Sequence, residues 1–324
     1  MKKRGIIASA LGVLLSSIGC SNSVNIINTY KYDNADEYLE GSFHYSKNEV
    51  KEVVIDWIKG KVDIEQTDND VLFVSESGTE LLDEEKLHYL LKDEVLYIRF
   101  CKSEYNFIKD DELKYLSVQI PKDIVLNAST ISAGVVSESL DLPEISLSTL
   151  SGNINIDTIK SPTINVSVSS GNININSIDT QRITISSMSG DILNDYLYAR
   201  DISISSSSGK NHFEVIKCDD FSSSSMSGEC VVNDIEAKEA NINTSSGNVT
   251  VGIRDLEKLV VSTMSGSVDI SLKGECGITT TYSSLSGKIN AEGFIVEDDK
   301  YVFGNRKCEA NVNTSSGSLC LSKE

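Results

Sequence analysis

The chain has 324 residues, of which 40% are hydrophobic, and a formal net charge of −19 at pH 7. This charge argues against nucleic acid as a partner, because phosphate backbones repel a surface rich in carboxylates. Only 3 residues are Pro, which favours a strand-rich protein, since Pro cannot donate to a β-ladder.

Residues 1–20 have the pattern of an export signal. Three basic residues near the start precede an apolar run that is too short for a permanent membrane span. The run ends at Ile18-Gly19-Cys20 and resembles a bacterial lipoprotein signal, although Ser17 stands where Leu is usual. We therefore expect lipidation of Cys20 and a lipid-anchored protein on the extracellular face of a bacterial cell membrane. The alternative is an ordinary secretory peptide.

Three segments are expected before the repeats. Residues 21–46 are polar and acidic and predict a flexible tether. Residues 47–115 predict a non-repeating, β-rich cap that closes the open edge of the following stack. Within this cap, residues 58–65 match half of the later repeat and indicate an earlier coil. Residues 82–87 predict a short helix.

Residues 116–324 form the predicted repeat domain, in which a Ser-Gly pair recurs with a 19-residue period. The glycines in register are Gly152, Gly171, Gly190, Gly209, Gly228, Gly247 and Gly266, with looser returns at Gly287 and Gly317. Apolar residues stand seven and five positions before most of these glycines, and two and four positions after them. This spacing of two is the strand period. Because the phase shifts between the pairs, each unit predicts three short strands and three bends.

One such unit cannot bury its apolar row, whereas stacked units can. Nineteen residues supply roughly 63 Å of extended chain, enough for one coil. The sequence therefore predicts an all-β protein, a single-stranded β-solenoid with 19-residue coils. We expect glycine at the corner because it adopts positive φ without steric hindrance, and Ser, Thr and Asn ladders along the stack.

The residue two before each glycine alternates between large and small. The row reads Leu150, Ser169, Met188, Ser207, Met226, Ser245 and Met264. If this side chain points inward, a large residue stacked on a small one fills the core without overpacking. The alternation also allows a second interpretation, in which the true coil spans two repeats, or thirty-eight residues, and its halves lie on opposite sides.

Near the end the spacing changes. Residues 292–307 predict a hairpin or loop that leaves the stack, and residues 310–321 predict one more coil. Atypical terminal units are normal in solenoids.

Several stretches resemble the DUF4097 family of bacterial adhesin-like proteins. They are Asp-Trp-Ile-x-Gly-x-Val-x-Ile at 56–64, Leu87-His88-Tyr89, the strand at 96–103, the Ser-Gly repeats, and Tyr301-Val302-Phe303-Gly304-Asn305. Arg306 departs from the family, which often has Gly there. The resemblance covers roughly residues 50–324. It implies a β-solenoid on a secreted or surface-anchored protein and supplies no catalytic residue.

Residues that could carry chemistry are few. None of His44, His88 and His212 has metal-ligand spacing with another histidine. The acidic pairs at 110–111, 219–220 and 298–299 lie in predicted turns, where solvated acids are usual. We therefore expect no catalytic residue, no metal and no cofactor.

Six cysteines remain besides Cys20. They are Cys101, Cys218, Cys230, Cys276, Cys308 and Cys320. Two pairs share a spacing of twelve positions, and disulfides are possible outside the cell. However, Cys230 falls at an inward position where buried free thiols are ordinary, so free thiols are favoured.

Two functions remain in view. The first is a non-catalytic, surface-anchored lipoprotein whose solenoid serves adhesion, envelope scaffolding or stress sensing, with a cell-surface or envelope protein or a glycan as partner. The second is a carbohydrate-active enzyme on a β-helix scaffold. Few aromatic residues and no cleft-forming long loops occur between 145 and 285, which favours the first.

Overall fold

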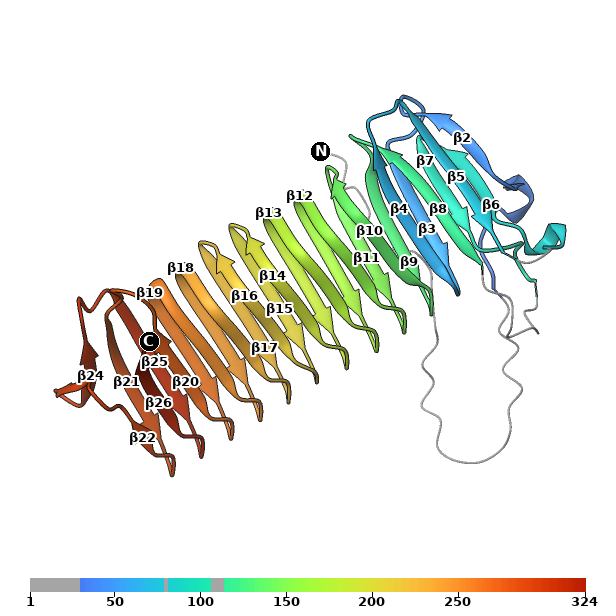
Figure 1. Ribbon diagram of the computed structural model, residues 1–324. Helices are drawn as coiled ribbons and strands as arrows, with labels where there is room; N and C mark the ends of the chain where they lie inside the picture. Colours follow the sequence, from blue (N-terminus) through green and yellow to red (C-terminus); the bar gives the residue numbers. More distant parts are fainter. Residues whose placement is uncertain (1–29, 79–80, 106–113) are drawn as a thin grey trace, which may run out of the picture.

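The computed structural model describes residues 30–78, 81–105 and 114–324 as one elongated β-solenoid (Figure 1). The regular coils make up the body, a broader layered cap closes one end, and a small hairpin leaves the stack at the other. Cys20 and the acidic pair at 110–111 lie outside the described residues. The prediction of an all-β solenoid is confirmed.

The cap consists of two solenoid coils and of short elements that lie beyond the outer one. Its elements are η1 (Ala35–Glu37), β1 (Leu39–Glu40), β2 (Phe43–Ser46), β3 (Glu52–Trp57), β4 (Lys61–Thr67), β5 (Val71–Ser77), η2 (Asp83–Glu85), β6 (His88–Lys92), β7 (Val95–Arg99) and β8 (Tyr115–Pro121). The helix predicted at 82–87 is the single 3₁₀ turn η2.

The regular coils follow. Their strands are β9 (Val125–Thr130), β10 (Gly134–Asp141), β11 (Ile145–Thr149), β12 (Ile154–Val168), β13 (Ile173–Ser187), β14 (Ile192–Tyr198), β15 (Asp201–Ser206), β16 (Asn211–Lys217), β17 (Asp220–Ser225), β18 (Cys230–Thr244), β19 (Val249–Thr263) and β20 (Val268–Leu272). The last elements are β21 (Ile278–Ser284), β22 (Ile289–Asn290), β23 (Ile295–Glu297), β24 (Lys300–Phe303), β25 (Cys308–Thr314) and β26 (Leu319–Lys323).

Each regular coil is one repeat long. Strand β12 pairs in parallel with β13, and Ile154, Ile164 and Val166 lie opposite Ile173, Ile183 and Ile185. The same offset, nineteen positions, continues from β13 to β14 and β15. The alternative of a coil that spans two repeats is therefore wrong.

Burial shows that the coil has three sides. Along β12 the buried side chains are two residues apart within 154–156, 159–161 and 164–168, and three residues apart between these groups. Each change of phase marks a bend, so the three predicted strands exist although they run together as one long bent strand. Ile173 is 1% exposed, whereas Asn172 is exposed. The predicted inward and outward positions are confirmed here.

The repeated glycine is required by close stacking rather than by its backbone angle. A Cβ at Gly190 would lie 1.7 Å from the carbonyl oxygen of Gly171, one coil away. The corresponding distance at Gly171, to the oxygen of Gly152, is 1.8 Å. Of the seven glycines in strict register only Gly209 has positive φ. The expectation that positive φ explains these glycines is therefore wrong for the other six.

At the N-terminal end, spatial order departs from chain order. Strand β3 lies between β7 and β9, parallel to both, and β4 lies between β8 and β10. The coil predicted at 58–65 is thus present, in register with β10. Outside these coils the pairing becomes antiparallel, with β5 on β8 and β6 on β7.

The prediction of a tether is wrong for residues 30–46. Strand β1 pairs with β6, and β2 pairs with β5. Aromatic contacts hold this segment in place: the ring of Phe43 stacks on Tyr89 with centroids 3.8 Å apart, and the rings of Tyr32 and Tyr38 lie 4.7 Å apart. The contact of Phe43 with Tyr89 joins residues far apart in the chain, so the local sequence pattern did not reveal it.

At the C-terminal end the last coil is inserted into the stack. Strand β25 lies between β19 and β21, and β26 lies between β20 and β22. The predicted hairpin at 292–307 is confirmed as β23 and β24, which are antiparallel and joined by a turn at Asp298 and Asp299. Strand β24 also pairs with β21 and covers that end of the stack.

Candidate binding face

Buried hydroxyl groups build the corner that precedes each glycine. The residue three before the glycine is usually Ser or Thr, and it is buried at Thr149, Ser187 and Thr263. The hydroxyl oxygen of Ser187 accepts a hydrogen bond from the Gly190 amide at 3.0 Å and donates one to the Gly190 carbonyl at 2.7 Å. A buried polar group is stable when it is paired in this way.

The buried hydroxyl determines the direction of the next side chain along the strand. Because the hydroxyl side chain points inward, the residue two before the glycine points outward. Met188, Met226 and Met264 are 61%, 59% and 62% exposed. The expectation that the alternating row fills the core is therefore wrong. We call the residues at this position the corner row.

In the C-terminal coils the corner row still alternates between large and small residues when it is followed in spatial order, although not in chain order. The backbone amide of Ser315 donates to the carbonyl of Met264 at 3.2 Å, and the amide of Ser286 donates to the carbonyl of Ser315 at 3.1 Å. Leu285, which is 90% exposed, is therefore the neighbour of Ser315. Along the stack the row reads Leu150, Ser169, Met188, Ser207, Met226, Ser245, Met264, Ser315 and Leu285. Large and small residues alternate strictly over these nine coils.

Beside the corner row lies a side of the solenoid whose outward residues are uncharged. Two columns of outward residues run along it, and we call them the hydroxyl–amide face. One column contains Ser146, Asn165, Thr184, Ser203, Ser222, Asn241, Val260, Asn311 and Thr281; the other contains Ser148, Ser167, Ser186, Ser205, Ser224, Asn243, Ser262, Asn313 and Ser283. The predicted ladders occur here, since the hydroxyls of Ser186 and Ser205 lie 3.0 Å apart.

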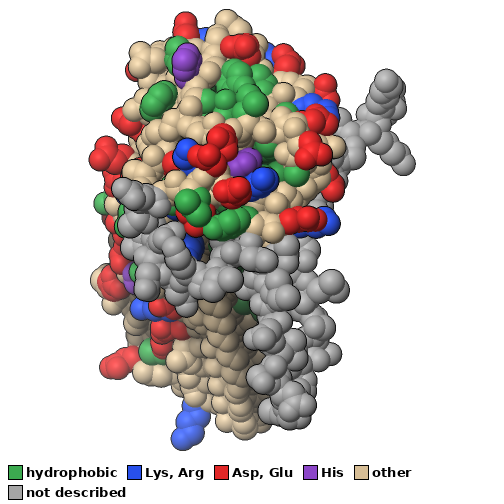
Figure 2. Space-filling view, turned by 90° about the vertical axis from the view of Figure 1, so that its right-hand side faces the viewer, with side chains coloured by type: hydrophobic (Ala, Val, Ile, Leu, Met, Phe, Trp, Pro, Cys, Tyr) green, Lys and Arg blue, Asp and Glu red, His purple; other side chains and the backbone are tan. Residues whose placement is uncertain are grey.

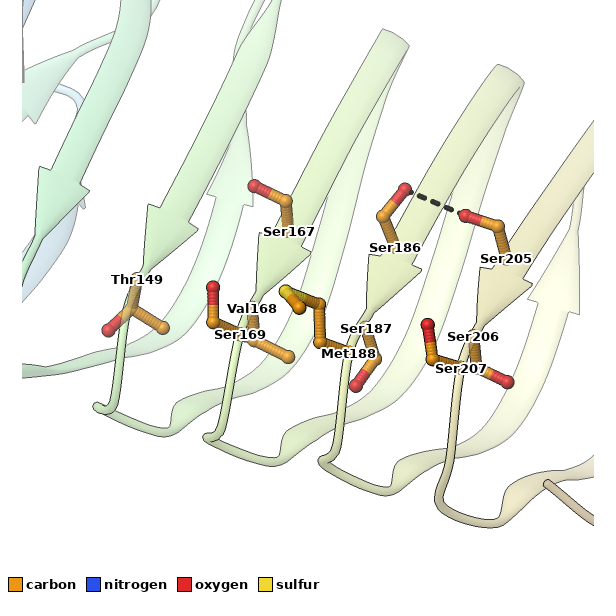
Figure 3. Close-up of a pocket in the computed structure, with 10 residues that line it drawn as sticks. All are labelled: Thr149, Ser167, Val168, Ser169, Ser186, Ser187, Met188, Ser205, Ser206 and Ser207. Carbon is orange, nitrogen blue, oxygen red and sulfur yellow. Dashed lines mark hydrogen bonds between the residues drawn. The ribbon is translucent and has the colours of Figure 1, made fainter. Parts of the chain in front are cut away.

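A shallow depression of about 380 Å³ lies where this face meets the corner row. Figure 3 shows Met188 extended over the coil of Ser169, with Ser186 and Ser205 joined by their hydrogen bond on the neighbouring column. The remaining lining residues are Ser, Thr and Val, so none of the lining residues is titratable.

Charged residues begin at the far border of the face. Arg182, Asp201 and Lys258 occupy the next outward column, and Arg182 approaches Asp201 at 3.4 Å along the stack. The cap also carries many charges. Figure 2, which views the molecule from the cap end, shows acidic and basic side chains scattered over the cap, while the flank of the coils below is mostly tan.

The cap holds a buried ion pair beside two aromatic rings. Lys114 Nζ lies 2.7 Å from Glu76 Oε2 and donates to the Phe100 carbonyl. The rings of Trp57 and Phe100 lie 4.9 and 4.5 Å from the same ammonium group. Burial lowers the pKa of Lys114, and the charge of Glu76 opposes that shift. This group is fully enclosed, so its role is structural.

The described histidines and the acidic pairs at 219–220 and 298–299 form no metal-binding cluster. His88 is buried with Nδ1 3.0 Å from the Lys86 carbonyl, and Nε2 of His212 lies 2.6 Å from Glu214. Asp219 forms an ion pair with Lys238 at 2.9 Å. Within the described residues, no group of three or more His, Cys, Asp or Glu side chains could hold a metal ion.

The six cysteines in the described part of the chain are free. Cys101, Cys230, Cys276 and Cys308 are buried, and burial raises the pKa of Cys230 to about 11 and that of Cys308 to about 12. A thiol with a raised pKa is a poor nucleophile and metal ligand. These side chains therefore pack as small apolar groups, as the inward position of Cys230 indicated.

Within residues 30–78, 81–105 and 114–324, no helix is long and apolar enough to cross a membrane.

Comparison with known proteins identifies the family. The model of the Toastrack DUF4097 family matches residues 50–321, so the chain belongs to this family, and the resemblance is confirmed. No curated protein matches the chain.

Solved structures that match the chain include three from Bacteroides and Parabacteroides species. A "putative lipid binding protein" from Parabacteroides distasonis is 14% identical, with a TM-score of 0.47, and the match covers 86% of this chain and 95% of that one. A "putative adhesin" from Parabacteroides merdae is 12% identical, with a TM-score of 0.46 and coverage of 90% and 98%. Another from Bacteroides fragilis is 13% identical, with a TM-score of 0.33 and coverage of 88% and 96%.

Proposed function

We propose that this Toastrack DUF4097 protein is a non-catalytic lipoprotein anchored through Cys20 to the outer face of the bacterial cell membrane. Its solenoid serves adhesion or envelope scaffolding, and the hydroxyl–amide face is its binding surface. The partner is an uncharged surface of a cell-surface or envelope protein or of a glycan.

One observation carries this proposal. In a chain with a net charge of −19, no residue of the hydroxyl–amide face or of the corner row is charged. The face offers hydroxyl and amide groups repeated every coil, at about 4.8 Å, so that donors and acceptors recur in register. Each contact is weak in water, but many together bind a regular partner, and many anchored copies strengthen the attachment further.

The same geometry disfavours catalysis. Catalysis needs unlike titratable groups that converge in a pocket with little water. The depression beside Met188 is open and lined by Ser, Thr, Val and Met. The acidic pairs at 219–220 and 298–299 do not line this depression; Asp219 forms an ion pair and Asp298 lies in a hairpin turn.

A binding screen tests the face. The purified chain is presented to cell-wall and host glycans and to isolated envelope proteins, and the double variant Ser186→Glu/Ser205→Glu is compared with the wild type. We expect at least tenfold weaker binding, because the variant buries two carboxylates against an uncharged partner. Leu193→Glu, on another side of the coil, is the matched control. Equal binding by all three proteins contradicts the assignment of the face, and glycan turnover that is lost in Asp219→Asn contradicts the absence of catalysis.

A labelling experiment tests the anchor separately. In its host, the wild-type protein should take up palmitate and remain in the membrane fraction. Cys20→Ala should lose the label and appear in the medium. A wild-type protein without lipid label shows that Cys20 is not a lipoprotein cysteine.

A further inference from the structure

The corner row has the shape of a self-complementary surface. Its large residues recur every second coil, about 9.6 Å apart, and the serines between them leave gaps of the same pitch. Nothing in the core requires this alternation, because these side chains point outward and Met226 is 59% exposed. A second row with the same pitch, shifted by one coil, would place its large residues in the gaps.

We propose that the partner of the hydroxyl–amide face is a second copy of this chain, bound antiparallel through this face and its corner row. This inference rests on the proposed function only in treating that face as the binding surface.

Symmetry selects the antiparallel arrangement. A two-fold axis along the stack would set each large residue opposite its own copy, so the rows would collide. A two-fold axis across the stack, between the coils of Ser207 and Met226, instead sets four of the five large residues opposite a serine. The resulting pairs between the copies are Met226 with Ser207, Met188 with Ser245, Met264 with Ser169, and Leu150 with Ser315. The same axis sets the fifth, the highly exposed Leu285, opposite Ile131, an apolar residue on the coil next to Leu150.

Charge favours this face for self-association. Two chains of net charge −19 repel each other across most approaches. The outward residues of the hydroxyl–amide face and the corner row are uncharged over nine coils. Two copies can therefore meet here without like-charge contacts, and their Ser and Asn side chains can hydrogen-bond across the contact.

The available area is sufficient. Ten coils, counting that of Ile131, extend roughly 48 Å along the stack, and the strip is roughly 17 Å wide, so each copy covers on the order of 800 Å². A specific protein interface of standard size buries about 800 Å² per partner.

The antiparallel geometry has a functional consequence. Two copies whose N-terminal ends point in opposite directions fit two membranes that face each other. If both are anchored at Cys20, the dimer joins neighbouring cells, which makes the protein a homophilic adhesin.

Sedimentation of the complete chain tests the dimer without its anchor. The chain carries Cys20→Ala and is kept in nonionic detergent, so that neither lipid nor the apolar run before Cys20 associates the copies. We expect a concentration-dependent dimer, and at least tenfold weaker association for Met226→Lys, which places a charge against the other copy. Leu193→Lys, an exposed apolar residue on another side, should associate as the wild type does.

A mixing experiment tests the register. Ser207→Glu and Met226→Lys should each weaken association, and their mixture should restore a heterodimer, because the two introduced charges of opposite sign meet across the axis. Ser207→Glu mixed with Met264→Lys should give no recovery. The proposal is overturned if the chain stays monomeric at all concentrations. It is also overturned if the Met226→Lys variant dimerises as well as the wild type.

The outcomes separate the two proposals. A monomer that still binds a glycan through the face overturns the second copy as partner and leaves the binding face in place. A chain that dimerises but takes up no palmitate in its host supports the interface and overturns the proposed anchor.

Discussion

The middle of the solenoid and its two ends follow different rules. In the middle, each coil stacks on the one that precedes it in the chain, at a constant offset of one repeat. At the N-terminal end, β3 lies between β7 and β9, and at the C-terminal end β25 lies between β19 and β21. Chain order and spatial order agree only in the middle.

This difference shows how an open stack is closed. An exposed coil at the end of a parallel sheet presents unpaired backbone groups that template aggregation. Each end instead adds antiparallel strands, β5 and β6 at one and β24 at the other. The insertion of β25 also keeps the corner row alternating to its end, because Ser315 comes between Met264 and Leu285.

The largest effect is expected from a charge inside a regular coil. Ile173→Asp places an unpaired carboxylate in the core and should lower the free energy of unfolding by more than about 4 kcal/mol. Asn172→Asp, one residue earlier and exposed, should change it by less than about 1 kcal/mol. Chemical denaturation measures both. Equal losses contradict the assignment of inside and outside.

The cap should depend on its buried charge. Lys114→Met leaves the Glu76 carboxylate buried without its cation and should lower the free energy of unfolding by about 3–5 kcal/mol. Lys47→Met breaks a pair of the same length, 2.7 Å to Asp70, at the surface, and its effect should stay below about 1 kcal/mol. Denaturant titration of both variants measures these free energies. An equally large loss of stability in Lys47→Met and Lys114→Met would show that burial of the ion pair does not explain the effect.

An added methyl group distinguishes a stacked corner glycine from a glycine in the hairpin segment outside the stack. Gly190→Ala forces a Cβ against the Gly171 carbonyl and should lower the free energy of unfolding by about 3 kcal/mol. Gly293→Ala, in the C-terminal segment, meets no atom within 4 Å and has φ of 84°, so its effect should be about 1 kcal/mol. Thermal unfolding gives both values. A smaller loss in Gly190→Ala than in Gly293→Ala contradicts the close-stacking account.

Alkaline pH should weaken the middle through its buried thiol. Burial raises the pKa of Cys230 from 9.0 to about 11. The protonated thiol therefore contributes stability that is present below pH 9 and is lost as pH rises towards 11, by about 2–3 kcal/mol. Urea titrations from pH 8 to 11 measure the slope. Cys230→Ala should show a shallower fall over this range, and an unchanged slope contradicts the assignment.

The sequence predicted the middle better than the ends for a physical reason. In a regular repeat the spacing of the apolar residues predicts how the coils align, so the inward position of Ile173 follows from spacing alone. The orientation of Met188 was missed because its polar neighbour Ser187 looked like the exposed residue. Ser187 is buried because the corner supplies both of its hydrogen bonds. The spatial order of the coils at the ends could not be predicted, since nothing in local sequence records that β25 enters the stack before β21.

The order of coils at the C-terminal end is the most direct test of this account, because the continuous corner row depends on it. Pairs of cysteines introduced on adjacent coils can form a disulfide, whereas residues two coils apart cannot without backbone movement. After mild oxidation and peptide mapping, we predict a bridge in Met264→Cys/Ser315→Cys and in Ser315→Cys/Leu285→Cys, and none in Met264→Cys/Leu285→Cys. A bridge only in Met264→Cys/Leu285→Cys would mean that the coils stack in chain order, which would contradict the account.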